Sequence, residues 1–312
     1  MNDFINFLKQ KENIKEQIKE NMIEPTGCIN CSQLSKYYKK NNDFLNLLND
    51  LHIEHNKVNF QISQLSLLPN NVNGVYTDYL IRYKICVELK REFYDDRCCL
   101  FLGKDKSFFD IEMPPYEMMF KSYENMRTSN ATDNDILNVS LCHFFSFKEY
   151  DERKYFNYFI NKKEDNYDQL QQFIKNKINA KENILLNPTL GNIDMQIGAD
   201  ADIIIDKELI DIKCSINKLG CQMSDFTQLI LYVCLYYYQT GIKCNKITIL
   251  NPVLSCEKSV DLSGWNNFDK VISILRKRVG LMSNNSDATK IENFTQFLNN
   301  RFSLIYNAGI DT

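Results

Sequence analysis

The sequence predicts an α/β fold, with a small mixed β-sheet flanked by helices in the second half of the chain and a largely helical first half. Three observations predict it. Apolar residues recur at helical spacing through most of the first half, β-branched runs separated by turn residues begin at residue 183, and a long apolar helix interrupts these runs. We therefore expect a mainly helical N-terminal region, 1–179, and an α/β region with C-terminal helices, 180–312.

The elements follow from the period of the apolar residues and from the turn residues between them. Helical spacing predicts helices over 4–22, 32–54 with a break at 41–43, 75–93, 114–128, 133–148, 167–178, 266–279 and 291–306. Turn-forming residues predict a loop over 69–74, and β-branched runs predict strands over 184–190, 200–206, 208–214 and 246–251. Residues 225–239 are too long and too evenly apolar for a strand, so we expect a helix packed against the sheet.

Composition and charge exclude some classes of function. The 312 residues carry a formal net charge of −3 and a pI near 5.8, which argues against a broadly basic surface that coats nucleic acid. Any contact with DNA is therefore expected to be local. Basic residues do cluster at 36–40 and at 276–278, but a solvated helix face is the simpler interpretation of each cluster.

The sequence also bears on the compartment. No apolar run approaches the ~20 residues of a membrane span, and the N-terminus lacks the apolar core of a signal peptide. The 11 cysteines are scattered, several of them within apolar patterns, as expected of reduced buried thiols. We therefore expect an intracellular protein, cytoplasmic or nuclear, without a membrane partner.

The segment 198–215 carries the candidate chemistry. Read as two strands, it places Asp202 at the start of one strand, and Asp211 and Lys213 on one face of the other. Carboxylate oxygens are the ligands that Mg²⁺ prefers, and such a cation beside a lysine suits phosphodiester hydrolysis. The alternative is an exposed ion pair between Asp211 and Lys213. Apolar residues flank these charges, however, and an unpaired buried charge is costly.

Asp202 and Asp211-Ile-Lys213 resemble the D…(D/E)xK signature of the PD-(D/E)XK, or restriction-endonuclease-like, nuclease superfamily. Gln228 and Tyr232 in the following helix are similar to the QxxxY motif of its RecB-like branch. The resemblance implies a restriction-endonuclease-like core that binds Mg²⁺ or Mn²⁺. It also implies that the glutamine and the tyrosine line the site and approach DNA.

The resemblance is strongest over 183–253 and implies further metal ligands. The backbone carbonyl of Ile212 is expected to bind the ion. Asp202 is preferred as the metal-binding aspartate because it directly precedes the apolar strand. Asp200, one strand period away and on the same face, stays the alternative. Glu182, ahead of the first strand, is a further carboxylate that would assist.

An earlier segment extends the resemblance into the first half of the chain. Gly74 and Asp78, in the segment 74–93, resemble the start of the G-x-x-x-H helix motif of RecB-like nucleases, with Asp78 in the histidine position. On this interpretation Asp78 is a third metal ligand. The alternative is a glycine that begins a helix, followed by a first-turn aspartate that complements the helix dipole.

The expected function is metal-dependent hydrolysis of DNA phosphodiester bonds, in phage defence, mobile-element biology or repair. Asp202 and Asp211 would hold the metal while Lys213 positions the attacking water. One alternative is a catalytically inactive restriction-endonuclease-like domain that binds nucleic acid or protein. Another is a zinc protein that uses the Cys and His side chains at positions 28, 31, 52 and 55. A protein partner or a second copy of the chain stays open, and the spacing of the downstream cysteines predicts no iron–sulfur cluster.

Overall fold

The computed structural model describes residues 29–63, 70–95, 114–145, 167–192, 197–215 and 223–282. The chain divides into two compact units, unit 1 (Met1–Thr26 and Ser66–Asp165) and unit 2 (Gly27–Leu65 and Asn166–Thr312). Contacts thus group the segment 27–65 with the second half of the chain, although the helical pattern of its sequence resembles the first half. The helices expected over 4–22 and 291–306 lie outside the described residues.

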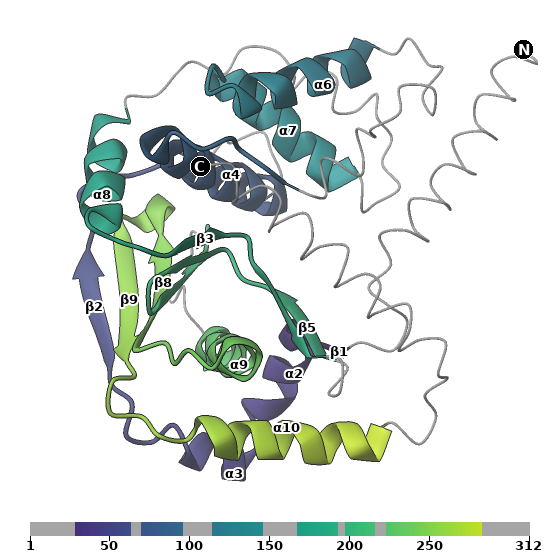
Figure 1. Ribbon diagram of the computed structural model, residues 1–312, viewed down its shortest axis with the longest axis vertical. Coiled ribbons are helices and arrows are strands. Elements are labelled where there is room, and N and C mark those ends of the chain that lie inside the picture. Colours follow the sequence, from purple (N-terminus) through teal and green to yellow (C-terminus); the bar gives the residue numbers. More distant parts are fainter. Residues whose placement is uncertain are drawn as a thin grey trace, which may run out of the picture. The chain divides into compact units, whose positions relative to one another are not determined.

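Unit 2 is a mixed α/β structure (Figure 1). Its strands are β1 (Ile29–Asn30), β2 (Ile53–Lys57), β3 (Ile184–Leu186), β4 (Thr189–Asn192), β5 (Ile197–Asp200), β6 (Ile203–Ile205), β7 (Glu208–Ile212), β8 (Lys246–Asn251) and β9 (Cys256–Asp261). Its helices are α2 (Cys31–Tyr38), α3 (Asn42–Asn46), α8 (Asp168–Ile178), α9 (Met223–Thr240), the 3-10 helix η4 (Pro252–Leu254) and α10 (Phe268–Met282). The expected mixed α/β class is confirmed.

The strands form two sheets. A six-stranded sheet has the order β2-β9-β8-β7-β6-β3, in which β7 and β8 are parallel and the other neighbours are antiparallel. A three-stranded sheet has the order β1-β5-β4, with β1 and β5 parallel. Because a parallel pair needs a crossover connection, β7 and β8 are joined by α9.

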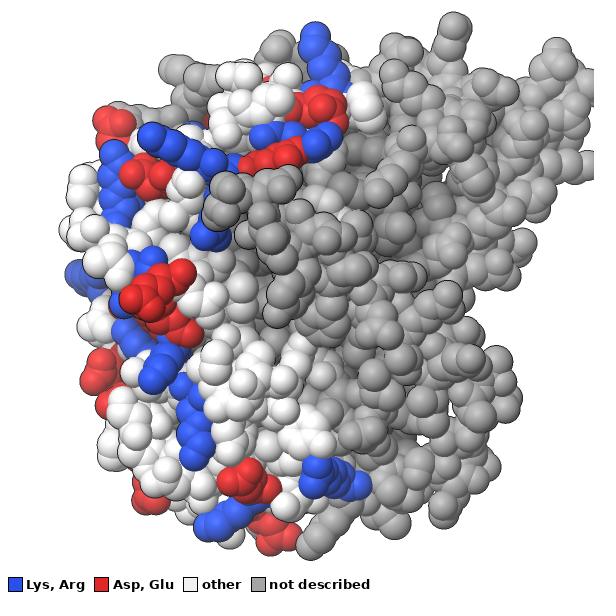
Figure 2. Space-filling model, in the orientation of Figure 1, with Lys and Arg blue, Asp and Glu red and all other residues white. Residues whose placement is uncertain are grey.

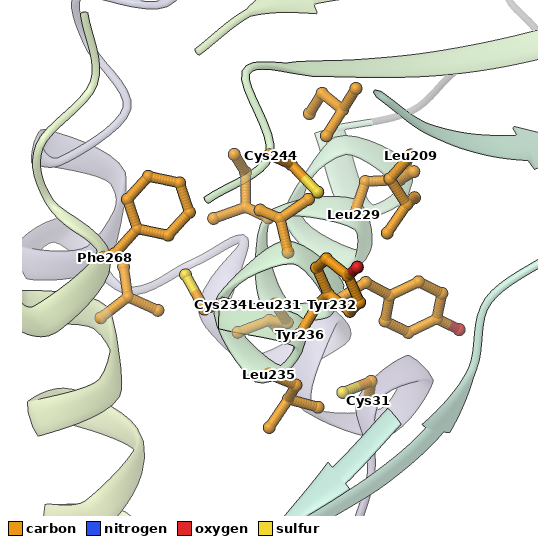
Figure 3. Packing of buried hydrophobic residues seen from close by; sticks show 14 of the residues in the cluster. Cys31, Leu209, Leu229, Leu231, Tyr232, Cys234, Leu235, Tyr236, Cys244 and Phe268 are labelled. Atoms are coloured by element: carbon orange, nitrogen blue, oxygen red, sulfur yellow. The ribbon is translucent and has the colours of Figure 1, made fainter. Parts of the chain in front are cut away.

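Helix α9 lies at the centre of the core of unit 2 (Figure 3). Its residues 229–236 are all buried, including Leu231, Val233 and Leu235 at 0% exposure. A helix that is apolar on every side must be covered on every side. The sheet residue Leu209, the α2 residue Cys31 and the α10 residue Phe268 belong to the same core. The expected packing of this helix against the sheet is confirmed.

Strand β2 corrects one expectation. Residues 53–57 pair with β9 at the edge of the large sheet, rather than ending the helix expected over 32–54. All five side chains of β2 are exposed, so the segment lacks the alternation that marks a half-buried strand. The rest of the expected helix forms α2 and α3, which are separated at Asn41; its side chain accepts a hydrogen bond from the backbone N–H of Phe44 at 2.9 Å.

One antiparallel ribbon runs through both sheets. The pairs β3–β6 and β4–β5 keep a single register, from Ile184 opposite Ile205 to Asn192 opposite Ile197. The ribbon bends between β3 and β4, where Asn187 has a left-handed φ of 50° and is followed by a proline. The bend interrupts the strands expected over 184–190 and 200–206. It carries the ribbon from the large sheet over α9 to the small one (Figure 1).

Unit 1 contains helices α4 (Asn70–Leu89), α6 (Pro114–Arg127) and α7 (Asp133–Phe145). Helix α7 contacts both α4 and α6. The guanidinium of Arg82 is 2% exposed; it donates to both carboxylate oxygens of Asp78, at 2.9 and 2.6 Å, and to Asp95 at 3.3 Å. Helix α4 begins at Asn70, so the loop expected over 69–74 is wrong for residues 70–74. Burial of Val72 at 0% exposure outweighs the weak helix propensity of its Asn and Gly neighbours.

No helix in the described ranges is both long and apolar enough to cross a membrane.

Glu208, at the start of β7, connects three elements of unit 2. Its carboxylate lies 2.9 Å from the Lys177 ammonium of α8 and accepts from the Thr248 hydroxyl of β8 at 2.6 Å. Lys246 lies 3.6 Å away. Burial raises the pKa of Glu208, but these partners together lower it by more than burial raises it. The folded-state pKa therefore lies below the ordinary value of 4.5. This stabilisation is therefore present above about pH 4.5 and is lost as the pH falls through the folded-state pKa.

We predict that Glu208→Gln lowers the free energy of unfolding by about 1–2 kcal/mol at pH 7 and by clearly less at pH 3. Urea unfolding at the two pH values measures this. Glu54→Gln on the exposed strand β2 is the control, with an expected change below about 0.5 kcal/mol. An equal loss at both pH values would show that the charge of Glu208 is not what stabilises this junction.

Candidate active site

The end of strand β7 places a carboxylate and an ammonium on the face that α9 covers. Leu209, Asp211 and Lys213 alternate along the chain and so share one face, and Leu209 packs in the core around α9. The Nζ atom of Lys213 lies 2.9 Å from Oδ2 of Asp211. Asp211 is 4% exposed, whereas 31% of the Lys213 side chain is exposed. The pair therefore joins a buried carboxylate to a partly exposed lysine side chain.

Asp202 reaches the same end of β7 from the bend of the ribbon. Its Oδ2 accepts a hydrogen bond of 2.6 Å from the backbone N–H of Ile212. The N–H and C=O of one strand residue leave the strand at the same edge. The carbonyl of Ile212 therefore leaves β7 on the side where Asp202 lies, so the backbone and two side chains offer oxygen atoms at one strand end.

These charges act strongly on one another. Burial lowers the pKa of the Lys213 ammonium, but the carboxylates of Asp211, Asp202 and Asp225 raise it by more. The net pKa therefore lies above its ordinary value. Lys213 is therefore positively charged at neutral pH. One ammonium among three carboxylates leaves an excess of negative charge, which a divalent cation would offset.

Gln228 and Tyr232 approach the carboxylates from α9. They are four residues apart and so lie on one helix face, where Nε2 of Gln228 donates to the Tyr232 hydroxyl at 2.7 Å. Tyr232 is 5% exposed. Burial raises the pKa of its hydroxyl, as do Cys31 and the charges of Asp211, Asp202 and Asp200. The aspartates thus act electrostatically on Tyr232, to which Gln228 is hydrogen-bonded.

The bend separates Asp200 from Asp202. Asp200 is the last residue of β5, and its Oδ1 accepts from the hydroxyl of Thr189 at 3.0 Å. Ala199 and the fully buried Ala201 face the core around α9. Strand β5 ends at Asp200, so Asp202 lies in the bend rather than in that strand. Because the alternate residues Ala199 and Ala201 both face the core, the expectation that the two aspartates share the other face stays a prediction.

Asp78 and Glu182 remain predictions as site residues. Asp78 belongs to unit 1, where Arg82 engages both of its carboxylate oxygens. Gly74 and Asp78 lie within α4 rather than at its start, so the interpretation as a helix-initiating glycine with a first-turn aspartate is wrong. Glu182 lies ahead of β3, and its backbone N–H donates to Oδ1 of Asp206 at 3.1 Å.

The residues of the zinc alternative are separated where the structure describes them. Cys31 is fully buried in the core beneath α9, and burial raises the pKa of its thiol. His52 and His55 are exposed, the latter on edge strand β2. Cys28 lies outside the described residues. No group of three of the described Cys, His, Asp or Glu side chains is placed to hold an ion.

Sequence reasoning missed Asp225, the third carboxylate near Lys213. It lies in the first turn of α9, three residues before Gln228 and seven before Tyr232. At 3.6 residues per turn these positions fall on one stripe of the helix. This helical spacing relative to Gln228 and Tyr232 could have identified Asp225 from the sequence. Thr189, which holds Asp200, was missed because the pairing of β4 with β5 was not expected.

The donor set fits Mg²⁺ or Mn²⁺ better than zinc. Asp202, Asp211 and the Ile212 carbonyl supply only oxygen, and Mg²⁺ is commonly held by one or two carboxylates together with water and substrate phosphates. Zinc sites in proteins rely mainly on cysteine and histidine. An ion at the end of β7 would therefore be of the hard, oxygen-binding kind.

Charges outside the site are mixed. Among the described residues on the face shown in Figure 2, Lys and Arg lie beside Asp and Glu rather than in a continuous basic field. Arg276, from the basic cluster 276–278, donates to the Tyr238 hydroxyl at 2.5 Å and stacks 4.9 Å from the centre of that ring. Arg276 thus packs against α9. This agrees with the interpretation of the cluster as an ordinary helix face.

No family model, curated protein or solved structure matches this chain. The functional conclusion therefore depends on the residues and on the geometry of the site.

We predict that Lys213→Met lowers the free energy of unfolding by about 2–4 kcal/mol in EDTA, because it leaves the buried Asp211 without its ammonium partner. Added Mg²⁺ should restore part of the loss. Urea unfolding with and without Mg²⁺ measures both effects. Lys181→Met removes an exposed ion pair with Asp206 and should cost less than about 1 kcal/mol under either condition. Wild-type stability of Lys213→Met in EDTA would contradict the prediction.

Proposed function

We propose that this chain is a divalent-metal-dependent nuclease that hydrolyses phosphodiester bonds of DNA, and that unit 2 has a restriction-endonuclease-like core. One observation carries the proposal. Asp202, through its bond to the Ile212 N–H, and Asp211, through its ion pair with Lys213, are both held at the end of β7. The mixed sheet and the apolar helix after the lysine strand support the same conclusion.

Asp202, Asp211 and the Ile212 carbonyl would hold the metal ion. When bound, Mg²⁺ or Mn²⁺ supplies Lewis-acid chemistry, which polarises the phosphate and lowers the pKa of a bound water. The chain's own residues do the positioning. The buried Asp211 is fixed by β7, and Asp202 is fixed by the Ile212 amide, so both carboxylates are held before substrate arrives.

Lys213 would act on the water and on the transferring phosphoryl group. Its side chain is partly exposed and its ammonium has more than one N–H donor, so it can donate towards a phosphate oxygen while keeping contact with Asp211. A fixed positive charge beside the phosphorus stabilises the negative charge that develops in the transition state. Lysine offers a compact charge with several donors, which suits this role.

Gln228 and Tyr232 would order the carboxylates and meet the DNA backbone. The Tyr232 hydroxyl accepts from Gln228, so its own proton is directed to another acceptor, and the charges of Asp211, Asp202 and Asp200 act on this hydroxyl. Gln228 is partly exposed, and its amide group can both donate and accept hydrogen bonds. The net charge of −3 limits the DNA contact to the surroundings of the site.

Cleavage assays with the purified full chain test the proposal. The substrates are linear and circular DNA, each single- and double-stranded, with Mg²⁺, Mn²⁺ or EDTA. We predict metal-dependent cutting that falls by about 100-fold or more in Asp211→Ala and in Lys213→Ala, because each removes a group that acts on the transition state. Asp269→Ala and Lys270→Ala, at exposed positions of α10, are matched controls and should retain full activity.

Two results would count against this proposal. Folded protein that binds Mn²⁺ yet cuts none of these substrates would favour the binding-module alternative. Cutting that persists in both site variants would point to a contaminating enzyme or to a site elsewhere in the chain.

A further inference from the structure

The bend of the ribbon lies beside the site and has an unusual hydrogen-bond pattern. The N–H of Asn187 donates to the carbonyl of Asp202 at 2.7 Å, and the N–H of Ala201 donates to the carbonyl of Pro188 at 3.1 Å. In a regular antiparallel ladder only alternate pairs are hydrogen-bonded. Here two adjacent pairs contribute one bond each, which marks the point where the ribbon changes direction.

A straight ribbon would fill the edge of β7 differently. In the register of β6 and β7, Ile203 lies opposite Ile210, so Ala201 would lie opposite Ile212. A straight β6 would thus let Ala201 exchange backbone hydrogen bonds with both the N–H and the C=O of Ile212. Instead, Ala201 donates to Pro188, and the Asp202 carboxylate takes the Ile212 N–H at 2.6 Å.

Two consecutive residues, Asn187 and Pro188, account for the bend. Asn187 has φ of 50°, a left-handed conformation that asparagine tolerates better than most residues and β-branched residues strongly avoid. The ring of Pro188 fixes φ at about −65°, away from the φ of a flat antiparallel strand, and the residue has no N–H to complete its pair with Ala201. Together they stop the ribbon from running straight past the end of β7.

We infer that Asn187 and Pro188 are positioning residues of the candidate site: the bend that they form withdraws the Ala201 backbone from Ile212 and directs the Asp202 carboxylate to that edge of β7. This inference rests on the proposed function for its catalytic consequence. Its structural content, the hold of Asp202 on the Ile212 amide, is independent of what the site does.

Hydrogen exchange at the Ile212 amide, resolved by NMR in the full chain, tests the structural content. Asn187→Val disfavours the left-handed conformation and should speed exchange at Ile212 by about ten-fold or more relative to neighbouring β7 amides. Asn187→Gly permits that conformation and should leave exchange within about threefold of wild type. Pro188→Ala releases the fixed φ while still permitting the bend, and should give an intermediate increase.

Ser255→Val is the matched control. Ser255 has the same left-handed φ of 50°, in the turn between β8 and β9, so valine there imposes the same backbone strain away from Asp202. It should leave exchange at Ile212 unchanged even where it lowers overall stability. Exchange at Ile212 that is unchanged in both Asn187→Val and Pro188→Ala, or that rises equally in Ser255→Val, would overturn the inference.

Mn²⁺ binding and steady-state cleavage test the catalytic consequence. Asn187→Val should weaken Mn²⁺ binding and lower kcat, each by about ten-fold, with KM for DNA within about threefold, and Asn187→Gly should restore both. If the wild type cuts no DNA but Ile212 exchange responds as described, the proposed function fails and the positioning role stands. If the wild type cuts DNA and Asn187→Val matches it in exchange, Mn²⁺ affinity and kcat, the positioning role fails alone.

Discussion

The hydrogen bond from the Ile212 amide to the Asp202 carboxylate joins two segments that would otherwise approach β7 separately. It takes the place of the bond that the Ile212 N–H would donate to the Ala201 carbonyl in a continuous antiparallel ladder, so a charged side chain occupies a position that the sheet would normally fill with main chain. The bent ribbon supplies Asp202, and β7 supplies Asp211 on its α9 face. The oxygen atoms of the candidate site are offered at one strand end because the Asp202 carboxylate replaces a backbone carbonyl as the acceptor of the Ile212 N–H.

A buried carboxylate has to be paired, and unit 2 provides such a partner for Asp211. Asp211 is nearly inaccessible and Lys213 is its ion-pair partner, while α9 brings Gln228 and Tyr232 to the same region. Because α9 is packed on all sides, these side chains stand on a rigid element. The excess of negative charge at the site lowers the stability of the folded chain in the absence of a cation. Functional sites commonly lower stability in this way.

Sequence reasoning succeeded where burial imposes a pattern and failed where it does not. The β-branched runs of β7 and β8 and the apolar length of α9 identified the elements that carry Asp211, Lys213 and Tyr232. The edge strand β2 was missed because all its side chains are exposed, and β9 because its sequence lacks a long apolar run. The bend at Asn187 depends on a φ value and on pairing between distant residues, which composition and periodicity do not contain.

The central claim is that Asp202 and Asp211 hold one divalent cation at the end of β7. Anomalous diffraction from crystals of the full chain soaked in Mn²⁺ tests it without any assumption about the substrate. The account predicts a peak about 2–2.3 Å from a carboxylate oxygen of each aspartate, with the Ile212 carbonyl within the same shell. A peak elsewhere in the chain, or none at this site while Mn²⁺ binds in solution, would contradict it.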